Sequence, residues 1–303
     1  MTSIVFFGTG PVAAASLDFI RRKFNIEVVI TKPRAPSFKG ITPVEELAKK
    51  HSYPVYFVST RAELDDIFHN NKFSSTAGIV VDFGIIMSRD VIDRFDHGII
   101  NSHFSLLPRW RGADPISYTI LSGDQKAGVS LMVIDEGLDT GKLITHKSTP
   151  VDTKETTGTL TEKLITLSNK LLESYLPRYL AGEIQPKNQP HLDRATFSHK
   201  ISKQDSFIDW NEPAVVIERK VRAYQPWPQA RAALGDIEVI ITEASTSEMG
   251  ISTPGKIIVE KNRLLVGTSE NWLEITRLKP AGKKEMPIQA FLAGYRQLLI
   301  AQD

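Results

Sequence analysis

The 303-residue chain contains no cysteine. This absence excludes disulfide scaffolds, cysteine nucleophiles, thiolate zinc sites and cysteine-held iron–sulfur clusters. The chain also lacks an apolar run near the roughly 18 residues of a membrane-spanning helix. Its opening residues, MTSIVFFGTG, have no basic segment ahead of a short apolar run. We therefore expect a buried strand there, not a secretory signal, and a cytoplasmic protein.

A strong excess of either charge is missing as well. The chain has 37 Lys and Arg against 35 Asp and Glu, a net charge of +2, and residues 201–303 carry 13 of each kind. Overall charge therefore gives no strong signal for nucleic-acid binding, which would need a local basic patch. The 41% hydrophobic and 24% charged residues are ordinary for a soluble globular protein, and the length suggests about two domains.

The first half of the chain alternates short apolar runs with helical patterns. Ser3–Phe7, Ile26–Thr31 and Ala77–Val81 predict strands, while Arg61–His69 and Thr156–Leu180 predict helices. Alternating strands and helices favour an α/β fold with a doubly wound, Rossmann-like parallel sheet and helices on both faces. Ligands of such sheets bind at the carboxyl ends of the strands.

The amino-acid composition and the pattern of apolar residues change near residue 183. Residues 182–195 are polar and include Pro186 and Pro190, which is typical of a linker. Short β-rich runs follow at 237–242, 255–260, 264–266 and 272–278, and they predict a small all-β, OB-like barrel. We expect three parts: a catalytic domain at 1–182, a linker at 183–203 and a C-terminal β-barrel domain at 204–303.

A glycine-containing turn, Gly8-Thr9-Gly10, follows the first predicted strand. Such a turn can offer backbone N–H groups to an anion. The dinucleotide fingerprint would place a third glycine where Ala13 stands, and an acidic residue at the end of the second strand, which reads Ile30-Thr31-Lys32. The turn is thus a weak indication of a nicotinamide site. A packing turn and a phosphate or carboxylate site both stay open.

Three polar residues form the strongest chemical signal. Asn101 and His103 stand two apart in an extended segment, so their side chains point to the same side, and Asp139 follows a later predicted strand. An amide that holds a carbonyl oxygen, a histidine that moves a proton and a carboxylate that orients the histidine suit acyl transfer to an amine. Each residue alone is more often structural. Their combination with a long polar loop indicates a site.

The surrounding motifs carry a resemblance. SLLPRWRGADPI (105–116), preceded by Asn-Ser-His and followed by the LDTG that contains Asp139, resembles the folate-dependent formyltransferases. VVDFGIIMSRDVID (80–93) resembles the pterin-pocket strand and loop of that family. FIDW (207–210), VRAYQPWPQA (221–230) and LKPAGKKEM (278–286) resemble the C-terminal domain of the methionyl-tRNA formyltransferases, the two-domain branch. The resemblance covers nearly the whole chain in order.

The resemblance implies formyl transfer from 10-formyltetrahydrofolate to the amino group of initiator methionyl-tRNA, for translation initiation. Asn101 and His103 would stabilise the tetrahedral oxyanion. Asp139 would orient His103 or a water and help to carry a proton from the amine to N10. The implied folate contacts, largely through backbone in the pterin loop, are Phe83, Gly84, Ile85, Ile86, Met87, Ser105, Leu106, Leu107 and Pro108.

Basic residues are the implied tRNA contacts. Those in the first domain are Lys32, Arg34, Lys39, Arg109 and Arg111, and those in the second are Arg222, Lys279, Lys283 and Lys284. Arg109 and Arg111 could instead meet the folate glutamate tail or be solvated surface residues. The expected partners are the tRNA and the folate. We expect no metal, no membrane contact and a monomer.

The chain departs from the family pattern in three places. The loop at 31–43, TKPRAPSFKGITP, is a few residues shorter than in tRNA formyltransferases. Ser102 replaces the usual β-branched apolar residue, and Asp114 adds a negative charge beside a loop that should approach phosphates. The short loop and the neutral second domain would suit a sugar-nucleotide N-formyltransferase with the same three polar residues. A formate-releasing hydrolase, a folate- or RNA-binding protein without activity and a nicotinamide-dependent dehydrogenase are further alternatives.

Overall fold

The computed structural model describes residues 2–35 and 40–300, the last of these by its backbone alone. The chain divides into two compact units, each described here by itself. Unit 1 consists of Met1–Pro115, Lys126–Pro150 and Thr161–His199, and unit 2 of Ile116–Gln125, Val151–Leu160 and Lys200–Asp303. The domain limits predicted from the sequence, 1–182 and 204–303, stay predictions.

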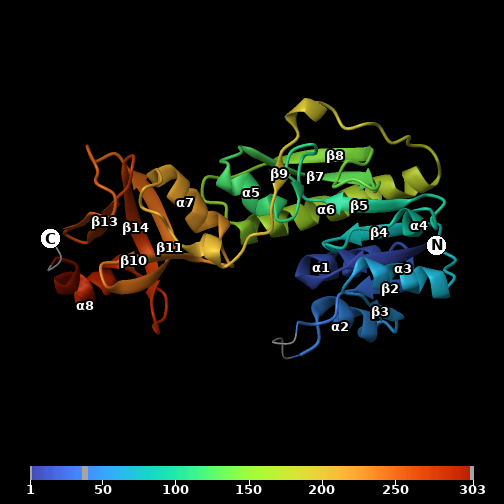
Figure 1. The fold of residues 1–303 in the computed structure, drawn as a ribbon, viewed down its shortest axis with the longest axis horizontal. Coiled ribbons are helices and arrows are strands. Elements are labelled where there is room, and N and C mark those ends of the chain that lie inside the picture. The colour runs from blue at the N-terminus through green and yellow to red at the C-terminus, as the bar shows by residue number, and fades with distance from the viewer. Residues whose placement is uncertain (1, 36–39, 301–303) are drawn as a thin grey trace. The chain divides into compact units, whose positions relative to one another are not determined.

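Unit 1 is built on a seven-stranded sheet with the order β3-β2-β1-β4-β5-β7-β8 (Figure 1). Its strands are β1 (Ser3–Gly8), β2 (Asn25–Thr31), β3 (Val55–Phe57), β4 (Ala77–Val81), β5 (Ile99–His103), β7 (Lys126–Val133) and β8 (Leu143–Pro150). The first five run parallel, whereas β7 is antiparallel to β5 and β8 to β7. The predicted doubly wound α/β fold is confirmed, with two antiparallel strands added at one edge.

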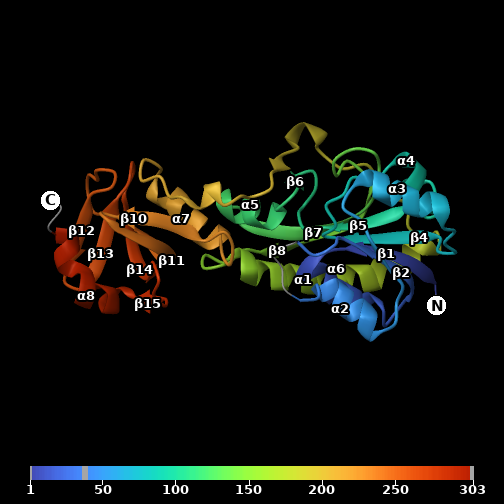
Figure 2. The ribbon, with the colours of Figure 1, turned by 60° about the horizontal axis from the view of Figure 1, so that its bottom comes forward.

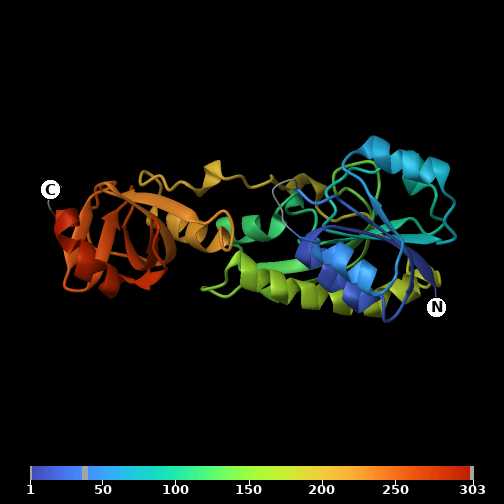
Figure 3. The same ribbon diagram turned by 90° about the horizontal axis from the view of Figure 1, so that it is seen from below.

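Helices cover both faces of this sheet, as Figures 2 and 3 show. Helices α1 (Gly10–Ile20), α2 (Pro43–Lys50) and α6 (Thr157–Leu180) lie on one face, and α3 (Arg61–Asn70) and α4 (Arg89–Ile92) on the other. Burial on both faces explains why the central strands are continuously apolar. The side chains of residues 4–7 in β1 and of residues 77–81 in β4 are all buried.

A short two-stranded sheet completes unit 1. Strand β6 (Arg111–Gly112) pairs in parallel with β9 (Phe197–Ser198), and the 3₁₀ turn η1 (Leu192–Arg194) precedes β9. The loop after β5 is thereby joined to a segment almost ninety residues further along the chain. This segment lies within the predicted linker at 183–203.

Unit 2 contains a six-stranded antiparallel sheet, in agreement with the predicted β domain. The strand order is β10-β11-β14-β13-β12, with β15 on β14. These strands are β10 (Ala230–Leu234), β11 (Ile237–Ser247), β12 (Ile257–Glu260), β13 (Arg263–Gly267), β14 (Trp272–Pro280) and β15 (Met286–Pro287). The predicted all-β domain is confirmed; within the described residues β10 and β12 do not pair, so its sheet is open between these two strands.

Three helices and a 3₁₀ turn also belong to unit 2, wholly or in most of their length. They are α5 (Pro115–Leu121), η2 (Gln204–Ser206), α7 (Ala214–Ala223) and α8 (Ile288–Ile300). Helix α7 packs against β11 and α8 against β12 and β14. The β-rich pattern of the sequence did not predict α8, although this helix closes the core.

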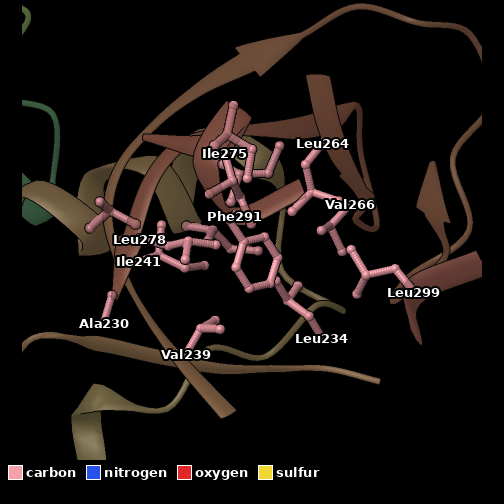
Figure 4. Packing of buried hydrophobic residues seen from close by; sticks show 14 of the residues in the cluster. Ala230, Leu234, Val239, Ile241, Leu264, Val266, Ile275, Leu278, Phe291 and Leu299 are labelled. Carbon is pink, nitrogen blue, oxygen red and sulfur yellow. The ribbon is translucent and has the colours of Figure 1, made fainter. Parts of the chain in front are cut away.

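The core of unit 2 centres on Phe291 of α8. Figure 4 shows its ring amid aliphatic side chains such as Ile241, Leu234 and Leu278. The Phe291 side chain is completely buried and its ring stacks on Tyr295, with 4.6 Å between ring centroids. One aromatic ring thus fills the space between the helix and the open sheet.

Phe291→Ala tests this packing. Removal of the buried ring leaves a cavity, so we expect a loss of about 3–5 kcal/mol in the stability of unit 2. Leu298→Ala on the same helix is the control, because Leu298 is 56% exposed. Hydrogen exchange of the β13 and β14 amides reports local stability. Equal losses from the two substitutions would contradict a core centred on Phe291.

Candidate active site

The structure brings Asn101, His103 and Asp139 together. Asn101 and His103 lie on β5, opposite Met132 and Ser130 of β7, and Asp139 lies in the turn between β7 and β8. The Asn101 Nδ2 donates to Asp139 Oδ1 at 3.3 Å, and the His103 Nδ1 lies 3.7 Å from Asp139 Oδ2. Two residues of one strand thus meet the carboxylate of a residue in a turn.

A backbone group completes the surroundings of this carboxylate. The N–H of Gly112, in the loop after β5, donates to Asp139 Oδ2 at 2.8 Å. Gly112 has φ +103°, and a Cβ there would lie 2.5 Å from the Ser198 carbonyl oxygen. Only glycine fits so close to β9 in this conformation. The Asp139 backbone is itself left-handed, with φ 52°, a conformation that aspartate tolerates better than most residues.

The hydrogen bonds of His103 fix the roles of its two ring nitrogens. Its Nε2 lies 2.8 Å from the carbonyl oxygen of Trp110, and the ring is almost fully buried. Because a carbonyl can only accept, Nε2 carries a hydrogen and donates it. In the neutral ring the lone pair of Nδ1 therefore faces Asp139. A proton taken up at Nδ1 would lie beside a carboxylate, which suits a group that accepts a proton during a reaction.

Most of the SLLP motif lies inside the loop after β5. Ser105, Leu107 and Pro108 are buried, and Leu106 is half-buried. The Ser105 Oγ donates to the Arg109 carbonyl at 2.6 Å, while the Ser130 Oγ donates to the Ser105 carbonyl at 2.8 Å. These contacts hold the loop to β7. Little side-chain surface of Ser105, Leu107 and Pro108 is left for a ligand.

The predicted pterin loop, residues 83–87, follows β4. Phe83 and Met87 are buried, and the Phe83 ring packs edge-on against Phe7 with 5.6 Å between centroids. Ile85 is half-buried, whereas Gly84 and Ile86 are exposed, Ile86 to 65%. Two buried anchors thus hold a short stretch of open backbone with one open isoleucine. Such a surface fits a flat, partly apolar ring.

The Gly8-Thr9-Gly10 turn borders the same loop. A Cβ on Gly8 would lie 2.6 Å from the Cβ of Ala13 and 2.8 Å from the carbonyl oxygen of Val81. The Thr9 N–H donates to the Asp82 carbonyl at 2.9 Å. These contacts favour the packing alternative for this turn, and that N–H is engaged within the protein.

Asp82 is a residue that the sequence reasoning missed. It follows β4 directly and has a left-handed backbone, with φ 48°. Solvent reaches its side chain, yet protein atoms surround it on several sides. Desolvation and the nearby Asp114 carboxylate raise the pKa of Asp82 from 3.8 to about 6, against the opposing effect of Lys32. An acidic residue directly after a buried strand was the available signal.

The basic residues predicted in the first domain lie in different surroundings. The Lys32 Nζ donates to the Gly84 carbonyl at 2.9 Å, and the exposed Arg34 donates to the Gly40 carbonyl at 3.3 Å. The Arg109 guanidinium lies 4.3 Å from the centroid of the Trp110 ring. Lys39 lies outside the described residues.

Arg111 is not at the surface. Its side chain is 7% exposed, and its Nη2 donates to the Gln189 Oε1 at 2.7 Å. The charge therefore faces a buried amide instead of solvent. Neither the solvated-surface alternative nor direct tRNA contact fits this position, so Arg111 is left out of the contacts proposed below.

The predicted basic residues of unit 2 divide in the same way. Arg222 donates to Glu218 at 2.5 and 2.9 Å and to the Glu155 carbonyl at 3.0 Å, so its guanidinium serves unit 2 itself. Lys279 is half-buried on β14. Lys283 and Lys284 are exposed in the turn between β14 and β15.

The described residues include no group of three or more His, Cys, Asp or Glu side chains that could hold a metal ion. No helix in the described ranges has both the length and the apolarity to cross a membrane.

Comparisons with known proteins agree with the two-part architecture. Residues 2–176 match the family model "Formyl transferase", and residues 200–296 match "Formyl transferase, C-terminal domain". The chain is 38% identical to a methionyl-tRNA formyltransferase of Halorhodospira halophila, over 97% of this chain and 96% of that protein. It is 35% identical to a methionyl-tRNA formyltransferase of Magnetococcus marinus, over 96% and 95%.

A solved structure shares the fold. It is the N-formyltransferase of Helicobacter canadensis in complex with folinic acid and dTDP-3-aminofucose, with a TM-score of 0.71 and 16% identity. The alignment covers 94% of this chain and all of that one. At this level of identity the likeness concerns the fold alone.

Asp82→Asn tests the electrostatics beside the site. Since the folded protein holds the Asp82 proton up to about pH 6 and the unfolded chain releases it near 3.8, ionisation of Asp82 lowers folding stability as the pH rises between these values. The variant should therefore gain stability over the wild type as the pH rises from 4 to 6, and keep that gain above pH 6. Chemical denaturation at about pH 5 and 7.5 measures the difference.

Asp66→Asn, at an exposed position of α3, controls for the change in net charge. A gain for Asp82→Asn that is equal at both pH values would contradict a raised pKa of Asp82.

Proposed function

The chain belongs to the formyl transferase family, and from that premise we propose that it transfers a formyl group from 10-formyltetrahydrofolate to the amino group of methionyl-tRNA. One observation carries the choice of acceptor: similarity to methionyl-tRNA formyltransferases extends over both units and nearly the whole chain. We further propose that the acceptor is the initiator tRNA, that the reaction serves translation initiation and that the protein acts as a cytoplasmic monomer.

Asn101 is proposed to stabilise the developing oxyanion. Its amide has two N–H groups, and one of them donates to Asp139 Oδ1. The second can donate to the formyl oxygen when the amine attacks the formyl carbon. Because the first bond fixes the amide plane, the second donor is oriented before substrate arrives, which is the condition for electrostatic stabilisation of a transition state.

His103 and Asp139 are proposed to handle the proton. The attacking amine must lose a proton and N10 of the leaving folate must gain one. The Nδ1 of His103 faces Asp139 Oδ2 at 3.7 Å and has no hydrogen in the neutral ring, so the pair can hold a proton between these steps. The imidazolium formed in this way would also favour the oxyanion beside it.

The formyl donor fits the loop after β4. The 10-formyltetrahydrofolate would supply the formyl carbon, and its flat pterin ring would need a surface to bind against. Open backbone at Gly84 and Ile85 and the exposed Ile86 offer this surface, in line with contacts made largely through backbone. The buried Phe83 and Met87 would hold this loop in place without touching the ring. Residues 105–108 would in the same way hold the loop after β5.

Four of the basic residues have side chains accessible to an RNA. Arg34, Lys283 and Lys284 are exposed, and Arg109 is partly exposed above Trp110. Phosphate contacts supply much of the affinity of proteins for nucleic acids. We therefore propose these four residues as contacts to the tRNA. Lys32 and Lys279 are half-buried, and we propose them as additional contacts.

Formyl transfer to parallel acceptors tests the function. With 10-formyltetrahydrofolate as donor, the acceptors are methionyl-tRNA, uncharged tRNA, an amino-sugar nucleotide and water. We expect formyl-methionyl-tRNA at a turnover above about 1 s⁻¹, within the usual range of enzymes. Transfer to the sugar alone would replace this function by that of a sugar N-formyltransferase, and no transfer to any acceptor would remove it.

Asn101→Ala tests the oxyanion role. Loss of one oxyanion donor lowers kcat by about 10²–10³ in comparable enzymes, and we expect that range here with the fold retained. Asn25→Ala is the matched control, since Asn25 is an exposed asparagine at the start of β2 whose amide donates to the Ser3 hydroxyl. Steady-state kinetics with methionyl-tRNA gives both values. An unchanged kcat in Asn101→Ala would remove Asn101 from the mechanism.

A further inference from the structure

Residues 187–198 are called the strap below. The strap contacts the turn that carries Asp139 and the loop after β5 that carries Gly112. Near its start, Lys187 and Leu143 exchange two backbone hydrogen bonds, of 2.7 and 2.9 Å, at the beginning of β8. Near its end, the Arg111 N–H donates to the Thr196 carbonyl at 2.9 Å, and the Trp110 N–H to the Thr196 hydroxyl at 2.9 Å. The strap is thus fixed at two points in unit 1.

Gln189 lies between these two points and is 5% exposed. Its Nε2 donates to the carbonyl oxygens of Asp139 and Gly141, at 2.8 and 2.9 Å. Its Oε1 accepts from the Arg111 Nη2 at 2.7 Å. Both amide hydrogens and the oxygen are therefore engaged within the protein. Burial of such an amide is favourable only when these bonds are made.

The turn that carries Asp139 depends on close contacts. Asp139 has a left-handed backbone, a conformation that is strained for most residues. A Cβ on Gly141 would lie 1.8 Å from the Val133 carbonyl oxygen, so the turn is pressed against the end of β7. The two carbonyls flanking Thr140 point to Gln189. The Gln189 side chain therefore holds the backbone of the turn on both sides of Thr140.

The same amide holds the opposite loop. Arg111, which donates to Gln189, directly precedes Gly112, and the Gly112 N–H donates to the Asp139 carboxylate. Gln189 thus connects the backbone of the Asp139 turn to the loop whose N–H group binds the Asp139 side chain. Its removal would free the turn and the loop to move relative to each other.

We propose that Gln189 is a positioning residue for formyl transfer, holding the Asp139 carboxylate against Asn101 and His103 through its bonds to the turn and to Arg111. The role in catalysis rests on the proposed function, whereas the role in placing Asp139 does not. Gln189 touches no reacting atom. It acts through Asp139, and its effect should disappear when the Asp139 carboxylate is removed.

Two substitutions separate its bonds. Gln189→Met keeps the length of the side chain and removes all three hydrogen bonds. Gln189→Glu keeps an acceptor for Arg111 and removes both donors to the turn. Ser198→Ala is the control, because the buried Ser198 hydroxyl, also in the strap, donates to the Arg111 carbonyl at 3.2 Å and has no bond to the turn.

Kinetics provides the first measurement. A misplacement of about 1 Å can cost on the order of 10²-fold in rate, so we expect kcat to fall about 10- to 100-fold in Gln189→Met and Gln189→Glu, with both KM values within about twofold. Ser198→Ala should keep kcat within about twofold. In the Asp139→Asn background, Gln189→Met should lower kcat by less than about twofold, because residues that act through one group are not additive.

Long-range ¹H–¹⁵N spectra of the histidine rings, without substrate, provide the second measurement. The His103 resonances should move in Gln189→Met and Gln189→Glu as they do in Asp139→Asn, and stay in place in Ser198→Ala. Thermal unfolding of each variant verifies that it is folded at the assay temperature.

The two measurements separate the possible failures. Unchanged His103 resonances in folded Gln189 variants would overturn the positioning role, whatever the enzyme's activity. A wild-type kcat in Gln189→Glu, or a full additive loss in the Asp139→Asn background, would also overturn it. An inactive wild type would remove the proposed function, while the spectra would still decide whether Gln189 places Asp139.

Discussion

The Asp139 carboxylate is the interaction on which the candidate site depends. It accepts from the Asn101 amide and the Gly112 N–H and faces the His103 ring, so three otherwise separate groups acquire a fixed arrangement around two oxygen atoms. A carboxylate has room for several donors, and each donor it accepts restricts the position of the others. The left-handed backbone at Asp139 persists because these bonds and those of Gln189 over-determine it.

The antiparallel edge of the sheet makes this arrangement possible. A parallel strand after β7 would need a crossover of a dozen or more residues, whereas an antiparallel partner needs only a short turn. Met132 pairs both with Asn101 on β5 and with Leu143 on β8, so the chain leaves β7 and returns to it within one turn. That turn carries Asp139 back to the side chains of β5. The strand order of a doubly wound sheet, extended by a hairpin, therefore decides where the carboxylate lies.

Sequence patterns predicted those features of the site that depend only on neighbouring residues in the chain. Asn101 and His103 share a side because residues two apart in a strand do, and the apolar runs of β1 and β4 predicted buried strands. The roles of residues that depend on partners far away in the sequence were not predictable in this way. Gln189 stands in a polar, proline-containing stretch typical of a linker, and nothing local tells which amide will be buried. The resemblance implied ligand contacts for Arg111 and Ser105, and their burial, which depends on distant partners, could not be predicted from the local sequence.

The charges of unit 2 bear on how an acceptor would be selected. On α7 the Arg222 guanidinium binds Glu218, and the Lys220 ammonium binds Glu212, so the charges of these two basic residues are largely neutralised within the unit. Exposed lysines of the unit, Lys283 and Lys284 among them, are still open to phosphate groups, and each phosphate contact strengthens binding to nucleic acid. Contacts to the RNA backbone that are the same in the bound substrate and in the transition state cannot raise kcat. Such contacts would still contribute to discrimination between acceptors, which is set by kcat/KM, whereas the rate of transfer to a bound amine would depend on the groups that meet at Asp139, where charge develops during the reaction.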